Sequence, residues 1–313
     1  MKKKISFIGA GNIGGTMASI ASGYNYADIV LYDINGDFAK GKALDISQMN
    51  VVNGHDTSII GTGDISEIND SDVIIITAGF PRKPQMTRDD LLTANAKIIG
   101  LVATNVAKYA PQAFCIIVTN PLDLMVFEFQ KRSGLPKHKV VGMAGTLDGA
   151  RFKCFLAEEF NVSVKDIEAT VLGGHGDSMV PVLSSVAVKG MRLGQMLKMN
   201  LTTQKRIDEI VNRVRHGGGE IVSLMQRGSA FYAPAACALE IAQSFLLNQN
   251  RVLTVSAFLD GEYGDIDGMA FGVPAVIGDN GVKRIIELNL DGHETQMLRQ
   301  SVEHLESLIF KLS

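Results

Sequence analysis

The chain has 313 residues, of which 46% are hydrophobic and 20% are charged, and its formal net charge is -3 at pH 7. This length suits a compact fold with room for two lobes, and the nearly balanced charge excludes a long-range field that would favour nucleic acid or an anionic membrane. No apolar run reaches the roughly 18 residues that a bilayer span requires. The three cysteines are widely separated among apolar residues, as is typical of reduced core thiols. We therefore expect a soluble, cytoplasmic protein whose partner is a small molecule, with no nucleic acid and no membrane.

The first part of the chain alternates short apolar runs with stretches of helical spacing. Helical spacing is found, for example, at residues 12–21 and 94–108. The apolar runs predict strands at residues 5–8, 29–32, 73–77, 114–118 and 140–143. Such strands imply a mostly parallel sheet covered by helices on both faces, with ligands at the carboxyl ends of the strands. Residues 1–145 are therefore predicted to form a doubly wound α/β domain of the Rossmann type.

After residue 145 the pattern changes to longer helical stretches with fewer strands. The predicted helices cover residues 149–160, 204–225, 235–246 and 294–311, and the predicted strands cover 252–259 and 270–277. No linker rich in proline, serine or charge separates this part from the first. We therefore predict that residues 146–313 form a mixed α+β substrate domain packed against the first domain.

A glycine-rich turn follows the first predicted strand. Gly9 permits a tight turn, Gly11 lets the backbone approach a pyrophosphate at a helix N-terminus, and Gly14 lets helix and strand pack closely. Asp33 ends the next strand, where a carboxylate can accept hydrogen bonds from ribose hydroxyls and disfavours a 2′-phosphate. A turn without a ligand is the alternative. The predicted NAD site consists of Gly9, Gly11, Asn12, Ile13, Gly14 and Asp33.

The segment after the strand at 73–77 carries two arginines, Arg82 and Arg88, among prolines. A guanidinium is a rigid, permanently charged fork of donors that matches a carboxylate. Two of them on one loop favour a small dianion as ligand, and a solvated basic turn is the alternative.

His175 lies in the sequence Gly173-Gly174-His175-Gly176-Asp177, which would expose an imidazole on a tight loop. Histidine suits proton transfer near neutral pH, as a catalytic base requires. A surface or capping histidine is the alternative, and a metal is not predicted because no third ligand lies at a useful spacing. Asp148 and Arg151 fall on one face of a beginning helix, where a weak surface ion pair is the alternative.

The chain also contains Val-Thr-Asn-Pro at 118–121. With all these motifs in this order and spacing, the chain resembles the lactate/malate dehydrogenase superfamily. It resembles specifically the malate dehydrogenases of the lactate dehydrogenase-like branch. The resemblance covers essentially the whole chain. It implies that His175 accepts a proton, Asp148 orients His175, Arg151 binds the substrate carboxylate and Arg88 polarises the reacting carbonyl. It further implies substrate contacts from Asn120 and Ser229, cofactor contacts from Asn95, Val118 and Asn120, and a cis peptide before Pro121.

Arg82 distinguishes the two best-known activities of this superfamily. Lactate dehydrogenases carry an uncharged glutamine there, whereas arginine resembles the malate-specific pattern and would pair with a second carboxylate. Leaving that charge unpaired costs on the order of 3 kcal/mol, or a discrimination above about a hundredfold. We therefore predict an NAD-dependent malate dehydrogenase, with L-lactate or another 2-hydroxyacid dehydrogenase as the alternative. Gln85 and Thr87 depart from the usual loop sequence and bear on loop closure.

Two other classes compete with this interpretation. An NAD-dependent glycoside hydrolase would need a metal, and a nucleotide-sensing scaffold would not need the catalytic set that the sequence retains. The resemblance also implies a homo-oligomer, either a dimer or a tetramer, assembled through helices near residues 37–49 and 204–225.

Overall fold

The computed structural model describes residues 2–80, 88–226 and 228–312, and this described chain divides into two compact units. The first unit comprises Met1–Met143, Phe231–Arg251 and Val276–Arg284, and the second comprises Ala144–Ala230, Val252–Ala275 and Ile285–Ser313. The break after Met143 lies beside the predicted boundary at residue 145. Two later segments return to the first unit, which a single boundary does not anticipate.

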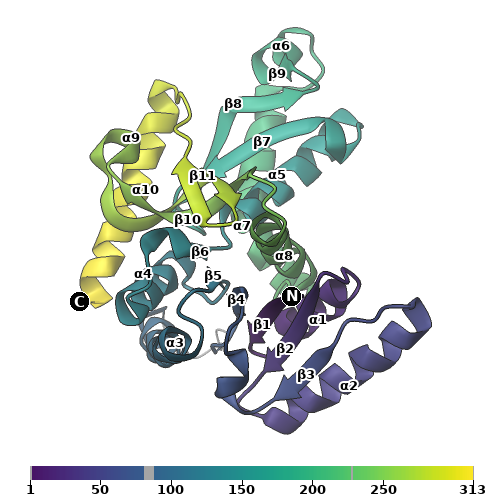
Figure 1. Cartoon of the computed structure of the whole chain (residues 1–313). Coiled ribbons are helices and arrows are strands. Elements are labelled where there is room, and N and C mark those ends of the chain that lie inside the picture. Colours follow the sequence, from purple (N-terminus) through teal and green to yellow (C-terminus); the bar gives the residue numbers. More distant parts are fainter. Residues whose placement is uncertain (1, 81–87, 227, 313) are drawn as a thin grey trace. The chain divides into compact units, whose positions relative to one another are not determined.

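A parallel sheet forms the centre of the first unit, as the sequence predicts (Figure 1). Its strands run in the order β6-β5-β4-β1-β2-β3, and each neighbouring pair is parallel. The strands β4, β5 and β6 are buried along their whole length because helices cover both faces. The strand bounds are β1 (Lys3–Ile8), β2 (Ala27–Tyr32), β3 (Ile59–Thr62), β4 (Val73–Ile76), β5 (Phe114–Ile117) and β6 (Val140–Gly142).

The helices of the first unit follow the strands in alternation. Their bounds are α1 (Asn12–Ser22), α2 (Gly36–Asn53), η1 (Ile65–Ile68), α3 (Arg88–Tyr109), α4 (Leu122–Ser133), η2 (Lys137–Lys139) and α8 (Tyr232–Leu246). Helix α8 explains why residues 231–251 return to this unit. It is strongly apolar, and its buried face packs against α1, β4 and β5. Strand β12 (Gly281–Ile285) follows later in the chain.

The second unit contains an antiparallel sheet and long helices, in agreement with the predicted mixed α+β domain. Strand β8 pairs with β7 and with β9, and α5 packs against both β7 and α7 (Figure 1). The core between them includes Phe152, Leu156, Val186 and Val214. The bounds are α5 (Gly145–Phe160), η3 (Val164–Asp166), β7 (Ile167–Leu172), β8 (Val180–Val188), β9 (Met191–Arg192), α6 (Leu193–Lys198), α7 (Gln204–Met225), β10 (Arg251–Asp260), α9 (Glu262–Asp265), β11 (Asp267–Gly278) and α10 (Gly292–Leu312).

Among the helices that the structure describes, none combines the length and the apolar character needed to cross a lipid bilayer.

Candidate active site

The turn between β1 and α1 requires glycine for steric reasons. Gly9 has a φ of +109°, and a Cβ atom there would lie 2.7 Å from Thr77 Oγ1. A Cβ atom on Gly14 would lie 1.8 Å from the Gly9 carbonyl oxygen. Any side chain at Gly14 would therefore force α1 away from β1, which is the close helix–strand packing expected of a dinucleotide-binding turn.

Gly11 leaves space at the N-terminus of α1. Within the described chain, nothing beyond its neighbours approaches within 4 Å of where its Cβ atom would stand, and no side chain caps the helix. The first N–H groups of α1, beginning at Asn12 and Ile13, form the positive end of the helix dipole. Open space in front of this end fits a pyrophosphate.

The Asp33 carboxylate is fixed at the end of β2 by backbone donors. Its Oδ2 accepts a hydrogen bond from Ala10 N at 2.8 Å, and its Oδ1 accepts one from Asn35 N at 2.9 Å. The side chain is half-buried beside the glycine turn. It is therefore positioned to accept hydrogen bonds from the ribose of a nucleotide bound to that turn.

Lys42 of α2 was not singled out from the sequence, yet it supports the glycine turn. Its Nζ donates a hydrogen bond to Gly11 O at 2.9 Å and lies 4.8 Å from the centre of the Phe38 ring. Burial lowers the pKa of Lys42, while the nearby Asp33 carboxylate opposes that shift. The sequence shows that Phe38 and Lys42 are four residues apart, as on one face of a helix. It does not show that this face of α2 lies against the glycine turn.

Asn95 of α3 joins the segments that follow β4 and β5. It is 1% exposed, and its Nδ2 donates to Asn120 O at 2.7 Å and to Phe80 O at 3.3 Å. Its Oδ1 accepts from Phe80 N at 2.8 Å. The Asn95 amide thus fixes the backbone of Phe80 and Asn120, which lie beyond the carboxyl ends of β4 and β5.

The segment after β5 has the expected backbone. Val118 is buried, Asn120 is exposed, and the Asn120–Pro121 peptide is cis, as the resemblance implies. Thr119 Oγ1 donates to Ala78 O at 2.8 Å and so ties this segment to the end of β4.

In the second unit, His175 lies on the loop between β7 and β8. Gly173 and Gly176 have φ values of +92° and +121°, which favour glycine. Two contacts anchor the loop: Gly173 N donates to Gly272 O at 3.0 Å, and Gly174 N donates to Ser301 Oγ at 2.9 Å. Ser301 lies on α10 and is 1% exposed. No sequence pattern marked it, because it is far from His175 along the chain.

Asp148 brings the predicted catalytic residues of this unit together. Its Oδ2 lies 2.8 Å from His175 Nδ1, and its Oδ1 accepts a hydrogen bond from Arg151 Nη1 at 3.1 Å. The Asp148 side chain is 2% exposed, against 16% for His175 and 14% for Arg151. A buried carboxylate between these groups stabilises a positive charge on the imidazole and fixes its orientation.

Arg151 retains a buried donor. Its Nε is buried and meets no hydrogen-bond acceptor among the described residues. A buried donor left unpaired is costly. The Arg151 stem runs along α7 at Gly217.

Several predicted site residues are not placed by these contacts. Arg82, Gln85 and Thr87 lie outside the described residues, as does the side chain of Arg88, whose backbone begins α3. Ser229 is described and is exposed. Among the described residues, no group of three His, Cys, Asp or Glu side chains is arranged to hold a metal ion.

Known proteins resemble this chain over both of its parts. Residues 3–142 match the family model for the lactate/malate dehydrogenase NAD-binding domain, and residues 145–312 match the model for the lactate/malate dehydrogenase alpha/beta C-terminal domain. Among solved structures, malate dehydrogenase of Cryptosporidium parvum is 46% identical, with a TM-score of 0.97, over 100% of this chain and 99% of that one. Lactate dehydrogenase of the same organism, solved with lactic acid and nicotinamide adenine dinucleotide, is also 46% identical, with a TM-score of 0.97, over 100% and 98%. Malate dehydrogenase of Plasmodium falciparum is 38% identical, with a TM-score of 0.95, over 99% and 98%. The chain therefore belongs to the lactate/malate dehydrogenase family of NAD-dependent oxidoreductases.

Proposed function

We propose that this protein is a malate dehydrogenase that oxidises (S)-malate reversibly to oxaloacetate. The observation that carries the chemistry is the buried Asp148 carboxylate, which contacts His175 on one side and Arg151 on the other. This arrangement offers a proton acceptor and a carboxylate-binding group held by the same buried anion. Both are needed to convert a 2-hydroxy acid to a 2-oxo acid.

His175 is the base in this proposal. Because Nδ1 contacts Asp148 at 2.8 Å, Nε2 is the ring nitrogen assigned to take the hydroxyl proton. The imidazolium that forms stays next to the Asp148 carboxylate, so its charge is compensated without a rearrangement of the protein. In the reverse direction the same imidazolium returns the proton to the carbonyl oxygen.

Arg151 fixes the substrate through the carboxylate next to the reacting carbon. One of its nitrogens, Nη1, is engaged by Asp148, and its buried Nε meets no acceptor among the described residues. A bidentate guanidinium–carboxylate contact sets orientation as well as affinity. We assign further contacts with the substrate to Arg88, Asn120 and Ser229, as the resemblance implies.

The residues of the first unit fit NAD. The open space at Gly11, the uncapped start of α1 and the fixed Asp33 carboxylate suit a pyrophosphate and a ribose. When bound, NAD supplies the hydride acceptor. The chain itself supplies placement, charge compensation and the proton acceptor.

The choice of malate over lactate rests on Arg82 in the sequence. The malate and lactate dehydrogenases of C. parvum are equally identical to this chain, so identity alone favours neither substrate. A second guanidinium on the loop would pair with the additional carboxylate of malate, whereas lactate would leave it unpaired. L-lactate dehydrogenase is therefore the second candidate.

Substitution of Arg82 by glutamine tests this choice, with Lys83→Gln as the control that removes an equal charge from the same loop. We expect Arg82→Gln to lower kcat/KM for oxaloacetate by about a hundredfold and to raise it for pyruvate, because about 3 kcal/mol of charge pairing is lost. Lys83→Gln should change the ratio by less than about threefold, because the resemblance assigns no substrate contact to Lys83. Equal substrate ratios in the two variants would remove Arg82 from the specificity argument.

A further inference from the structure

Helix α7 carries three consecutive glycines, Gly217, Gly218 and Gly219, inside one continuous helix. Glycine in a helix interior is destabilising relative to alanine, because more backbone freedom is lost on folding. Local helix propensity therefore does not explain this run. What each position faces offers an explanation.

The three positions differ in what a side chain would meet. A Cβ atom at Gly217 would lie 3.2 Å from Arg151 Cδ and 3.5 Å from Arg151 Nε. A Cβ atom at Gly218 would make an ordinary contact with Arg151 Nη2, at 3.7 Å. At Gly219, apart from its neighbours and the backbone of its own helix, it would find no atom of the described chain within 4 Å. The steric demand for glycine is thus graded along the helix and strongest at Gly217, which is buried.

Contact with α7 is one of the constraints that place the Arg151 guanidinium. Another is the hydrogen bond from Nη1 to Asp148 at 3.1 Å, whereas Nε meets no acceptor among the described residues. A methyl group at Gly217 would have to displace the Arg151 stem by a few tenths of an ångström, because α5 and α7 pack directly together. That displacement would pass to the guanidinium and strain its contact with Asp148.

We propose that Gly217 is a positioning residue for the substrate carboxylate, because it leaves the space in which the Arg151 side chain lies. The inference rests on the proposed function, in which Arg151 binds that carboxylate. Small misplacements of a substrate-binding group reduce catalysis strongly, since the reacting atoms must be aligned. The helix thus keeps a destabilising residue at the position where a larger one would move the substrate.

The matched pair Gly217→Ala and Gly219→Ala tests the inference, because the same methyl group is added to the same helix. We expect Gly219→Ala to raise the melting temperature by about 2 °C and to leave the KM values for oxaloacetate and NADH unchanged. Gly217→Ala should raise the KM for oxaloacetate by about tenfold or more, while the KM for NADH changes by less than about twofold. A merely structural role would not separate the two KM values.

A second comparison asks whether Gly217 acts through Arg151. If it does, Gly217→Ala should change kcat/KM by less than about twofold in an Arg151→Lys background, where the guanidinium is already absent. Equal KM values for oxaloacetate in the Gly217→Ala and Gly219→Ala proteins would overturn this inference and leave the proposed function intact. The same conclusion would follow if Gly217→Ala lowered kcat/KM as much in the Arg151→Lys background as in the wild-type background. Absence of wild-type turnover with both oxaloacetate and pyruvate would refute the proposed function, and this inference with it.

Discussion

Replacement of Asp148 by asparagine tests the catalytic arrangement with little change in shape. The carboxylate makes hydrogen bonds to His175 Nδ1 and Arg151 Nη1 at 2.8 and 3.1 Å, and its side chain is 2% exposed. Hydrogen bonds to charged groups contribute about 1.5–3 kcal/mol each, and neutral ones are about half as strong. The neutral asparagine amide would therefore lose about half of the energy of each contact. For the two contacts together this loss is about 1.5–3 kcal/mol, which corresponds to a decrease of about 10- to 150-fold in kcat/KM.

The assay is oxaloacetate reduction followed by NADH absorbance, with NADH binding followed separately by fluorescence. We expect kcat/KM to fall within that range while NADH binding is retained, because the nucleotide site belongs to the other unit. Glu294→Gln is a suitable control. Glu294 is also a buried carboxylate of the second unit, where it accepts hydrogen bonds from Ser184 N and Ser184 Oγ. This control should lower the melting temperature and leave kcat/KM within about twofold of wild type. An Asp148→Asn enzyme with more than a third of wild-type kcat/KM would refute the role assigned to Asp148.

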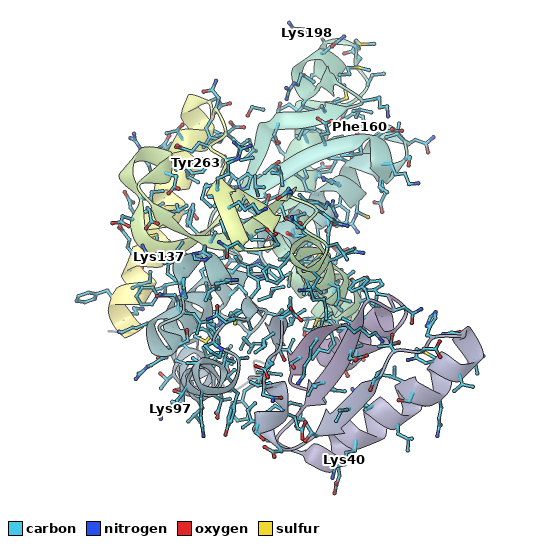
Figure 2. All side chains as sticks on the ribbon, viewed as in Figure 1. Lys40, Lys97, Lys137, Phe160, Lys198 and Tyr263 are labelled. Atoms are coloured by element: carbon cyan, nitrogen blue, oxygen red, sulfur yellow. The ribbon has the colours of Figure 1, made fainter. Side chains whose placement is uncertain are left out.

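Three further predictions follow from the structure. Lys42→Met removes the ammonium group that donates to the glycine turn, so the Kd for NADH should rise about tenfold. Lys40 also projects from α2 (Figure 2) and serves as the control. An equal rise in Kd for Lys40→Met would show that only a general loss of positive charge matters. Ser301→Ala removes the hydroxyl that accepts from Gly174 N, so kcat should fall while the Kd for NADH is unchanged; an unchanged kcat would show that the loop holds His175 without this contact. Burial raises the pKa of Tyr263 to about 12, and its phenol group contributes stability that is full below the usual pKa of about 10 and is lost as pH rises through 12. Urea titrations should therefore show Tyr263→Phe to be less stable than wild type at pH 8, with a gap that narrows above pH 10; a gap that stays constant with pH would contradict the shifted pKa.

The alternation of strands and helices in the first unit was predictable because its signals are local. The apolar runs of β1 and β4, the turn from Gly9 to Gly14 and the acid at Asp33 each depend on neighbouring residues. Periodicity and glycine stereochemistry therefore sufficed to predict them. The strand predictions for β10 and β11 succeeded for the same reason.

What the sequence could not predict depends on contacts between distant residues. Helix α8 has the composition of a buried helix, but nothing local indicates that it packs on α1 of the first unit. The hairpin of β7 and β8 was also missed, since the alternation in β8 is interrupted by a continuous buried stretch at its start. Lys42 supports the glycine turn, and Ser301 supports the loop of His175, each from an element that is separate in the sequence.

In the candidate site, too, contacts between neighbouring residues were predictable and contacts between distant elements were not. Helical spacing placed Asp148 and Arg151 on one face, and only the family resemblance implied that Asp148 orients His175. In the structure Asp148 contacts both residues. The packing of Arg151 against Gly217 was not expected, because no spacing rule relates α5 to α7. The part played by Arg82 and the assembly into a homo-oligomer remain predictions.

The most direct test of the central claim is the ratio of kcat/KM for oxaloacetate to that for pyruvate in the wild-type protein. The two oxo acids differ at the position that the second carboxylate would occupy, so the ratio measures the charge pairing assigned to Arg82. A ratio above about one hundred, unchanged by a chelator, is the predicted result. A ratio of one or below would contradict the malate assignment and favour a lactate dehydrogenase on the same catalytic framework.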